Sequence, residues 1–437
     1  MPNWCIILNL GSVQKKIFKL IMRKLLLLIV FTLSASVSYA GGYRVSLQGQ
    51  RALAMGHTGV AVVSNAELGF FNPSGLVLLE NKINISVGIS PVFSDVVWQN
   101  EEFGETARTD SPVGTPFYLY ASYKMNDWLA LGLSVYTPYG SSVVYEDDWA
   151  GSHLVNNISL QAIYFQPVAS VKVLESLTIG GGPIYVNGSV NFNRNLNRTL
   201  TDLEGNRSNV TIDASGVSAW GWSAGAIYSP TDQLRIGVNY RSEIMIEAKD
   251  GEATFSNVPE SPLTPFENTK FDASLPLPAE LTVGLSYEFL EKWLVAFDYN
   301  INYWDVYKSL DIDFSDPNIP NSQNVRNYKN SSIYRFGVQY DATERFVLRA
   351  GYYFDESPIQ EGYFAPETPR NDSHGYTGGL SFNINDSFAI DAAFLYIRFK
   401  EINASYDYYT ENGQAVPFGG TYKSSAFIPG LGLTYKL

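Results

Sequence analysis

The sequence is poor in the residues that carry covalent and metal chemistry. Its 437 residues include one cysteine, Cys5, and three histidines, His57, His153 and His374. A single cysteine cannot form an internal disulfide, and three dispersed histidines do not spell out a metal site or a Ser-His pair. We therefore expect no enzymatic activity, no cofactor and no metal; a lipase is the remaining enzymatic alternative.

Long hydrophobic runs and an excess of positive charge are also lacking. After residue 40, no stretch approaches the roughly 20 apolar residues that a membrane-spanning helix needs. Charged residues make up 17% of the chain and the formal net charge is −13, so no nucleic-acid partner is expected. Aromatic residues reach 14%, with 29 tyrosines and 25 phenylalanines. A lipid-embedded chain without spanning helices must satisfy its backbone by closing a barrel.

The first forty residues indicate a targeting segment. Met22–Lys24 form a positively charged start, Leu25–Leu33 an apolar run, and Ser38–Ala40 a cleavage site of small residues around Tyr39. The pattern predicts a secretory signal peptide within residues 1–40, with Gly41 as the first mature residue. The residues before Met22 indicate a start codon set too far upstream; a long positively charged leader is the alternative.

The rest of the chain alternates apolar and polar residues. From Trp293 to Tyr303, the odd positions hold Trp, Val, Phe, Tyr, Ile and Tyr, and the even positions hold Leu, Ala, Asp, Asn and Asn. A period of two places alternate side chains on opposite faces of a strand. One oily face and one mostly polar face, repeated around a closed sheet, are typical of an outer-membrane barrel.

This unit recurs about fourteen times, and short and long connections alternate. The sequence therefore predicts an all-β fold: a transmembrane antiparallel β-barrel of about 14 strands over residues 82–437. Tight turns of such barrels lie on the periplasmic side and long loops outside, so both chain ends are expected in the periplasm of a Gram-negative cell. The expected strands lie near 82–92, 116–125, 128–137, 157–172, 177–194, 210–228, 233–249, 269–288, 292–305, 330–341, 345–355, 373–383, 387–402 and 421–437.

The segment 41–81 differs from the strands that follow it. Glycines punctuate small, mostly uncharged residues, and alternation is poor. A solvated N-terminal arm would tend to be charged or rich in Pro and Ser, whereas small uncharged residues suit close packing in a lumen. We expect this segment to be a plug inside the barrel; an arm outside the barrel is the alternative.

Charged residues in the strands mark the inner face. Arg235, Arg241 and Arg349 alternate with apolar neighbours, and an arginine facing the bilayer midplane would cost about 2 to 4 kcal/mol. These three side chains should therefore point into the lumen. They are candidates to hold a ligand headgroup, or they pair with acidic residues on neighbouring strands.

Several short motifs carry a family resemblance. They are Gly42-Tyr43-Arg44, Asn72-Pro73-Ser74-Gly75, Tyr136-Thr137-Pro138-Tyr139-Gly140, Asp148-Trp149-Ala150-Gly151, Tyr240-Arg241-Ser242-Glu243 and Phe354-Asp355-Glu356-Ser357-Pro358. In register with the strands and the plug, they resemble the FadL/TodX family of outer-membrane transporters for long-chain fatty acids and other hydrophobic compounds. The chain departs from that family at Ser74, where the family has Ala, and at the terminal Leu437, where it usually has Phe.

The resemblance implies passive uptake of a hydrophobic small molecule. The family route runs from a groove between outer loops, through a pocket shaped by the N-terminus, to a lateral gap at an inward kink of the third strand. Tyr136, Pro138 and Gly140 are the candidates for that gap, because Pro cannot donate to a ladder and Gly relieves strain at a bend; an ordinary strand end is the alternative. Tyr43 is the candidate gate, or a simple packing residue.

Four further residues are candidates for holding the plug or the ligand. Asn72 and Pro73 suit a structural turn in the plug more than ligand contact, because Asn bonds its own backbone and Pro fixes its dihedral angle. The resemblance places Lys329 and Asn187 at two headgroup positions, and a neutral Asn at one of them leaves fatty acid, aromatic hydrocarbon and other lipids open.

The expected partners are a hydrophobic small molecule and outer-membrane lipid, and the barrel is expected to be a monomer. The main alternative is a general diffusion porin or a structural or adhesive outer-membrane barrel. A porin should lack a plug and should line its lumen with charges. It usually has about sixteen or more strands.

Overall fold

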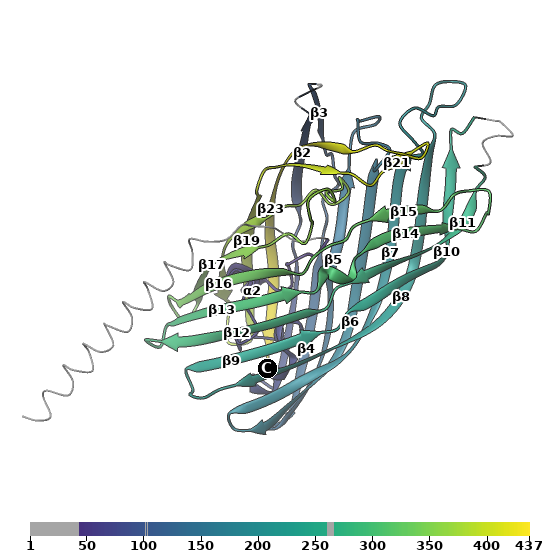
Figure 1. Cartoon of the computed structure of the whole chain (residues 1–437). Helices are drawn as coiled ribbons and strands as arrows, with labels where there is room; N and C mark the ends of the chain where they lie inside the picture. The colour runs from purple at the N-terminus through teal and green to yellow at the C-terminus, as the bar shows by residue number, and fades with distance from the viewer. Residues whose placement is uncertain (1–42, 101, 103, 260–265) are drawn as a thin grey trace, which may run out of the picture. The chain divides into compact units, whose positions relative to one another are not determined.

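The computed structural model describes residues 43–437, except residues 101, 103 and 260–265. The expected signal peptide and the Gly41 boundary lie outside the described residues. Within them, β-strands dominate and helices are short (Figure 1). None of the helices in the described part of the chain is long and apolar enough to cross a membrane.

Fourteen strands of the described chain close into an antiparallel ring, which confirms the predicted fold class. Each strand pairs with the next, and the last pairs with the first. In ring order the strands are β1 (Ile83–Ile89), β4 (Phe117–Asn126), β5 (Leu129–Val144), β6 (Asn157–Leu174), β7 (Leu177–Asn195), β8 (Asn209–Tyr228), β9 (Leu234–Arg241), β12 (Glu280–Phe289), β13 (Trp293–Asn302), β16 (Ser331–Asp341), β17 (Phe346–Asp355), β18 (Ser373–Asn383), β19 (Phe388–Phe399) and β23 (Phe418–Lys436).

Connections at one end of the ring are short, and those at the other end are long. Only Asp127 and Trp128 separate β4 from β5, whereas β5 and β6 are joined by residues 145–156. The chain ends close to the first wall strand: Ile83 and Leu437 exchange two backbone hydrogen bonds of 2.8 and 2.9 Å. The terminal Leu437 is thus part of the ladder that closes the ring.

The long connections carry further strands. These are β2 (Phe93–Asn100), β3 (Glu105–Arg108), β10 (Ile244–Ser256), β11 (Thr269–Leu277), β14 (Ser309–Phe314), β15 (Ser322–Val325), β20 (Ile402–Tyr406), β21 (Thr410–Glu411) and β22 (Gln414–Ala415), with a 3₁₀ turn η2 (Trp304–Val306). The prediction of one strand over 269–288 is wrong, because β11 pairs with β10 and β14 whereas β12 pairs with β9 and β13. The break lies at Pro278, which has no backbone N–H to continue a ladder.

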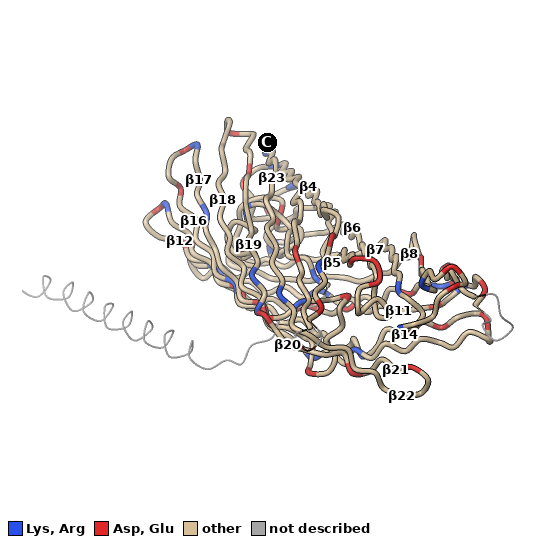
Figure 2. The backbone as a smooth tube through the Cα atoms, turned by 90° about the horizontal axis from the view of Figure 1, so that it is seen from above, with Lys and Arg blue, Asp and Glu red and all other residues tan. Residues whose placement is uncertain are grey.

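The faces of the strands follow the sequence pattern. In β12, Val283, Leu285 and Tyr287 are exposed, whereas Gly284 and Ser286 are buried. The exposed apolar residues form the lipid-facing surface, and Figure 2 shows charged residues mostly at the turns and in the long loops. This distribution suits a barrel wall, where charge on the lipid side is costly.

The segment before β1 is short helices and loops. It contains α2 (Gln50–Ala54), α3 (Leu68–Phe71) and the 3₁₀ helix η1 (Pro73–Leu78). Helix α2 contacts β17, β18, β19 and β23, and η1 contacts β4, β5, β6, β7 and β8, so the segment touches strands around much of the ring (Figure 1). Nearly all of its residues between Leu47 and Leu79 are buried.

Candidate functional site

Asn72 fastens the N-terminal segment to the wall. Its side-chain amide donates to the carbonyls of Val60 (2.8 Å), Ala226 (3.1 Å) and Val238 (3.3 Å), and its Oδ1 accepts from the backbone N–H and hydroxyl of Ser74. Pro73 begins η1. Asn72 is fully buried. The geometry supports the structural interpretation of Asn72 and Pro73.

The wall makes room for the plug backbone with glycines and binds it with polar side chains. A Cβ added at Gly237 would lie 2.2 Å from the Val60 carbonyl oxygen, and one at Gly351 would lie 2.1 Å from the Gly56 nitrogen. Asp298 of β13 accepts hydrogen bonds from the backbone N–H groups of Gly59 (2.8 Å) and Val60 (3.1 Å). At Gly237 and Gly351, the backbone of the N-terminal segment lies so close to the wall that any larger residue would collide with it.

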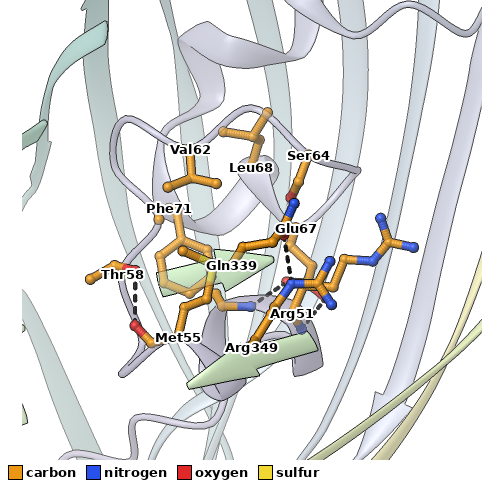
Figure 3. Close-up of a pocket in the computed structure, with 12 residues that line it drawn as sticks. Arg51, Met55, Thr58, Val62, Ser64, Glu67, Leu68, Phe71, Gln339 and Arg349 are labelled. Atoms are coloured by element: carbon orange, nitrogen blue, oxygen red, sulfur yellow. Dashed lines mark hydrogen bonds between the residues drawn. The ribbon is translucent and has the colours of Figure 1, made fainter. Parts of the chain in front are cut away.

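A small pocket remains between the plug and strands β16 and β17 (Figure 3). The Glu67 carboxylate there accepts hydrogen bonds from the backbone N–H groups of Arg51 (3.3 Å) and Ala52 (3.2 Å). Arg349 donates to Gln339 (2.8 Å) and to Ser381 (2.6 Å). Polar groups at this pocket therefore hold the plug and one another.

Strand β5 changes partner at the motif predicted to form a gap. Its ladder with β4 runs only as far as Tyr118 opposite Tyr136, and its register with β6 shifts between Tyr136 and Tyr139. Beyond that point the N-terminal segment takes the place of β4. The Val45 N–H donates to the Pro138 carbonyl (2.8 Å), and the Gly140 N–H donates to the Tyr43 carbonyl (3.1 Å).

The N-terminal segment thus completes the wall at this edge. Gln48 adds a side-chain hydrogen bond to the Thr137 carbonyl (3.1 Å). On the far side, β5 resumes bonding with the chain after β3, where the Asp110 N–H donates to the Val144 carbonyl (2.9 Å). A three-residue piece of the plug therefore lies where a wall strand would otherwise be needed.

Tyr43 is the centre of an aromatic cluster inside the barrel. Its ring centroid lies 4.9 Å from Trp304, 5.8 Å from Tyr307 and 6.0 Å from Tyr139. Its hydroxyl donates to the Pro276 carbonyl, and the side chain is 3% exposed. Tyr43 therefore joins the wall break to the outer loops that carry Trp304 and Tyr307.

A buried ion-pair group adjoins this cluster through Tyr139. Glu280 pairs with Arg44 (2.6 Å) and with Arg241 (3.2 Å), and it also accepts from the Tyr139 hydroxyl (3.2 Å). The Arg241 guanidinium lies 4.4 Å from the centre of the Phe70 ring. Arg241 is thus paired with a carboxylate, as the alternative interpretation of the lumenal arginines expected; Arg235 likewise pairs with Glu288 (2.6 Å).

The outer loop 356–372 closes over the cluster. Arg370 donates to the Arg44 carbonyl (3.1 Å), Glu367 pairs with Arg326, and the Tyr145 hydroxyl donates to the Pro366 carbonyl (3.1 Å). Burial raises the pKa of Asp372, at the end of this loop, to about 7. The loop therefore contacts both the N-terminal segment and other outer loops.

Lys329 and Asn187 are placed in different environments. Lys329 lies in the loop before β16, where partial burial lowers its pKa while Glu356 and Asp372 oppose that shift. Asn187 alternates with the fully buried Val186 and shares its face of β7 with Tyr185, whose ring contacts the exposed Trp220. This placement on the outer face does not support a headgroup role for Asn187.

A cavity of about 690 Å³ lies among the outer loops. The described residues that line it include two acidic residues, Glu102 and Glu361, and no lysine or arginine. Its polar lining is mostly amide and hydroxyl side chains, whereas Phe364 connects it to the aromatic cluster. The lining includes Gln99, Gln360, Phe364, Asn403, Ser405 and Thr421.

The sequence did not predict the aromatic partners of Tyr43 or the ionic partner of Arg44. Trp304, Tyr307 and Glu280 lie more than two hundred residues away along the chain, and no local motif links them to the N-terminus. The sequence could have indicated that Glu280 faces inward, because it begins a strand in which polar and apolar residues alternate. That signal gives a side chain's face but not its partner.

Comparisons with known proteins agree with this architecture. The family described as outer membrane protein transport protein (OMPP1/FadL/TodX) matches residues 31–437. The 47 kDa outer membrane protein of Pasteurella multocida is 24% identical, over 86% of this chain and 89% of that protein. The long-chain fatty acid transport protein of Escherichia coli K12 is 19% identical, over 92% and 98%.

Solved structures show the same fold. A Pseudomonas aeruginosa FadL homologue superposes with a TM-score of 0.77 at 17% identity, covering 91% of this chain and all of that one. The Pseudomonas putida toluene transporter TodX gives 0.70 at 18% identity, covering 91% and 99%. The chain belongs to the OMPP1/FadL/TodX family of outer membrane transport proteins.

Proposed function

We propose that this outer-membrane protein takes up hydrophobic small molecules passively, through a plugged monomeric barrel with lateral release at β5. The supporting observation is the exchange of wall partners: Tyr43 and Val45, rather than β4, bond to the edge of β5 at Gly140 and Pro138. Movement of the N-terminal segment would leave this edge unpaired. The wall would then part next to the aromatic cluster.

The cluster is suited to an oily ligand. Tyr43, Tyr139, Trp304 and Tyr307 present ring faces and edges, and each buried methylene of a ligand gains about 0.8 kcal/mol over water. An open aqueous pore would lose that gain, which favours a closed, greasy route over a general diffusion porin. Fatty acids and aromatic hydrocarbons, which the names of relatives mention, are the proposed ligand classes.

The orientation follows from the connections. In the proposed orientation, the short turns and both chain ends lie on the periplasmic side and the long loops lie outside, as is usual for outer-membrane barrels. Ligand would pass the outer loops, reach the Tyr43 cluster and leave sideways into outer-membrane lipid at Pro138–Gly140. Transport would need no catalytic step.

The test is uptake in a host that lacks its own transporter for these compounds. Cells carrying the wild-type protein should accumulate radiolabelled oleate or radiolabelled toluene faster than cells carrying an empty vector. A Tyr43→Ala variant should fold and insert, but accumulate more slowly, because the rings lose their common contact. Accumulation of neither compound above the empty vector would contradict the proposed function.

A further inference from the structure

The wall has a second interruption, between β8 and β10. The ladder of β8 with β9 ends at Ser223 opposite Arg241. Two further hydrogen bonds join Ser242 and Trp222: the Ser242 N–H donates to the Trp222 carbonyl (2.9 Å), and the Trp222 N–H donates to the Ser242 hydroxyl oxygen (3.0 Å). Pairing with β10 begins only at Asp213 opposite Glu252. Between these points, residues 214–221 and 244–251, all described in the structure, form no ladder with each other; we call this stretch the β8–β10 seam.

On the side away from the seam, each of the two strands pairs with another strand. Through the seam, β8 is paired with β7 along most of its length, and β10 is paired with β11. Each edge is therefore a strand that lacks a ladder partner on one side, and each carries a register shift within the seam, near Gly216 in β8 and near Asp250 in β10. The two strands remain neighbours, no ladder is formed across the seam, and the Ile244 side chain lies against Gly221.

The packing across the seam is apolar. The inward side chains Ala219, Ile244 and Ile246 are buried and belong to the same hydrophobic cluster as Tyr43 and Tyr139. The charged side chains of the seam, Glu247, Lys249 and Asp250, are exposed. Glu247 and Lys249 pair with each other (3.0 Å), and Asp250 pairs with Lys270 (3.3 Å). The buried side of these two segments therefore carries no charged side chain, and the charges lie on the exposed side.

Large apolar side chains surround the seam on the outside. Trp220 is 68% exposed, Trp222 50% and Met245 43%. Tryptophan favours the membrane–water interface, and unpaired backbone groups cannot lie in the hydrocarbon core. The seam also lies in the half of β8 that is remote from the short turn after Tyr228. These features place it at the outer leaflet.

We propose that the β8–β10 seam is a lateral entrance, through which hydrophobic molecules dissolved in the outer leaflet reach the aromatic cluster. The inference rests on the proposed uptake function and adds a route distinct from release at β5. Parting the seam breaks no ladder hydrogen bond, because none spans it. Where two wall strands form a ladder, separating them breaks the backbone hydrogen bonds between them.

The first test locks the seam with cysteines. In a Cys5→Ser background, the double variant Ser218→Cys/Glu247→Cys places two thiols on exposed positions on either side of the seam. A short bifunctional thiol reagent links them, and mass spectrometry measures the extent of linkage. The matched control is Asp213→Cys/Glu252→Cys, on the same two strands where they are already paired. We expect linkage at the seam to cut accumulation of radiolabelled toluene several-fold and linkage at the control pair to leave it unchanged.

The second test widens the seam. A Cβ at Gly221 would lie 2.5 Å from Ile244 Cγ1 and 2.9 Å from Ser242 Oγ, so Gly221→Ala should push the strands apart and increase accumulation. Unchanged accumulation in a fully linked seam variant would overturn the entrance while the wild-type protein still transports. Failure of the wild-type protein to accumulate toluene or oleate would instead overturn the proposed function itself.

Discussion

The two interruptions of the wall differ in what closes them. At β5, the N-terminal segment supplies backbone hydrogen bonds through Tyr43 and Val45, and Arg44 adds a buried ion pair with Glu280. At the β8–β10 seam, no ladder joins the described residues 214–221 and 244–251, and Ile244 lies against Gly221. We call the first closure the latch, because the proposed exit at β5 requires its release; the second closure is a packed joint. In the proposed route, the seam is the entrance and the edge of β5 is the exit.

Removing the latch altogether should have the largest effect. Deletion of residues 41–74 would take away the N-terminal partner of β5 and most of the material inside the barrel. We expect a small conductance from the intact protein in a planar bilayer and a large, steady conductance from the deletion. Retained β-structure in circular dichroism is the control. A large steady conductance from the intact protein would favour the general diffusion porin.

Weakening the latch should come next. Glu280→Gln leaves Arg44 and Arg241 buried without their carboxylate, and breaking a buried pair costs about 3–5 kcal/mol. We expect faster hydrogen exchange in the 43–48 backbone, with exchange in the seam unaltered. The matched control is Glu288→Gln, which breaks the partly exposed Arg235 pair and should cost less than about 1 kcal/mol. Equal exchange in both variants would contradict the latch.

Straightening β5 tests whether its irregularity matters for release. In a Pro138→Thr/Gly140→Val variant, β5 regains a backbone donor and two β-branched residues, which favour a continuous strand. A Cβ at Gly140 would lie 3.3 Å from the Leu160 carbonyl oxygen, so a small shift accommodates it. We expect the protein to fold, yet to accumulate toluene several-fold more slowly. Normal accumulation by a folded double variant would count against release at β5.

A substitution at the candidate headgroup residue Lys329 should have a smaller effect on accumulation, and the effect should differ between the two ligands. If Lys329 receives a carboxylate, Lys329→Ala should slow accumulation of oleate more than that of toluene. Lys308→Ala, which removes another lysine of the same outer loop, is the control. Equal loss for both compounds would remove Lys329 from a headgroup role.

The sequence predicted the wall well because its period of two is local. The alternation within a single strand shows which of its side chains face lipid. In β12, for example, Val283 and Leu285 are exposed, whereas Gly284 and Ser286 are buried. The tight turns are local as well. The split of residues 269–288 at Pro278 was missed, although the proline was visible, because both halves continue the same alternation.

The closures could not be predicted, since they depend on which segments meet across the ring. The Tyr136–Gly140 motif pointed to an irregular strand, but nothing in it names Tyr43 and Val45 as the replacement partners. The seam is harder still, because residues 214–221 and 244–251 look like ordinary strands and differ only in having no common ladder. Pairing is a property of two segments, and sequence periodicity describes one at a time.

The smallest expected effect concerns the outer loop that covers the latch. Burial raises the pKa of Asp372 to about 7, Glu356 and Asp355 reinforce the shift, and Lys400 and Lys329 oppose it. A carboxyl whose pKa is raised in the closed loop stabilises that loop when protonated. The stabilisation is complete below the ordinary aspartate pKa of about 4 and is lost as the pH rises to about 7. Hydrogen exchange in loop 356–372 should therefore be slower at pH 5 than at pH 8, after correction for intrinsic rates. Asp372→Asn should abolish the difference, and persistence of the difference in that variant would assign it to another group.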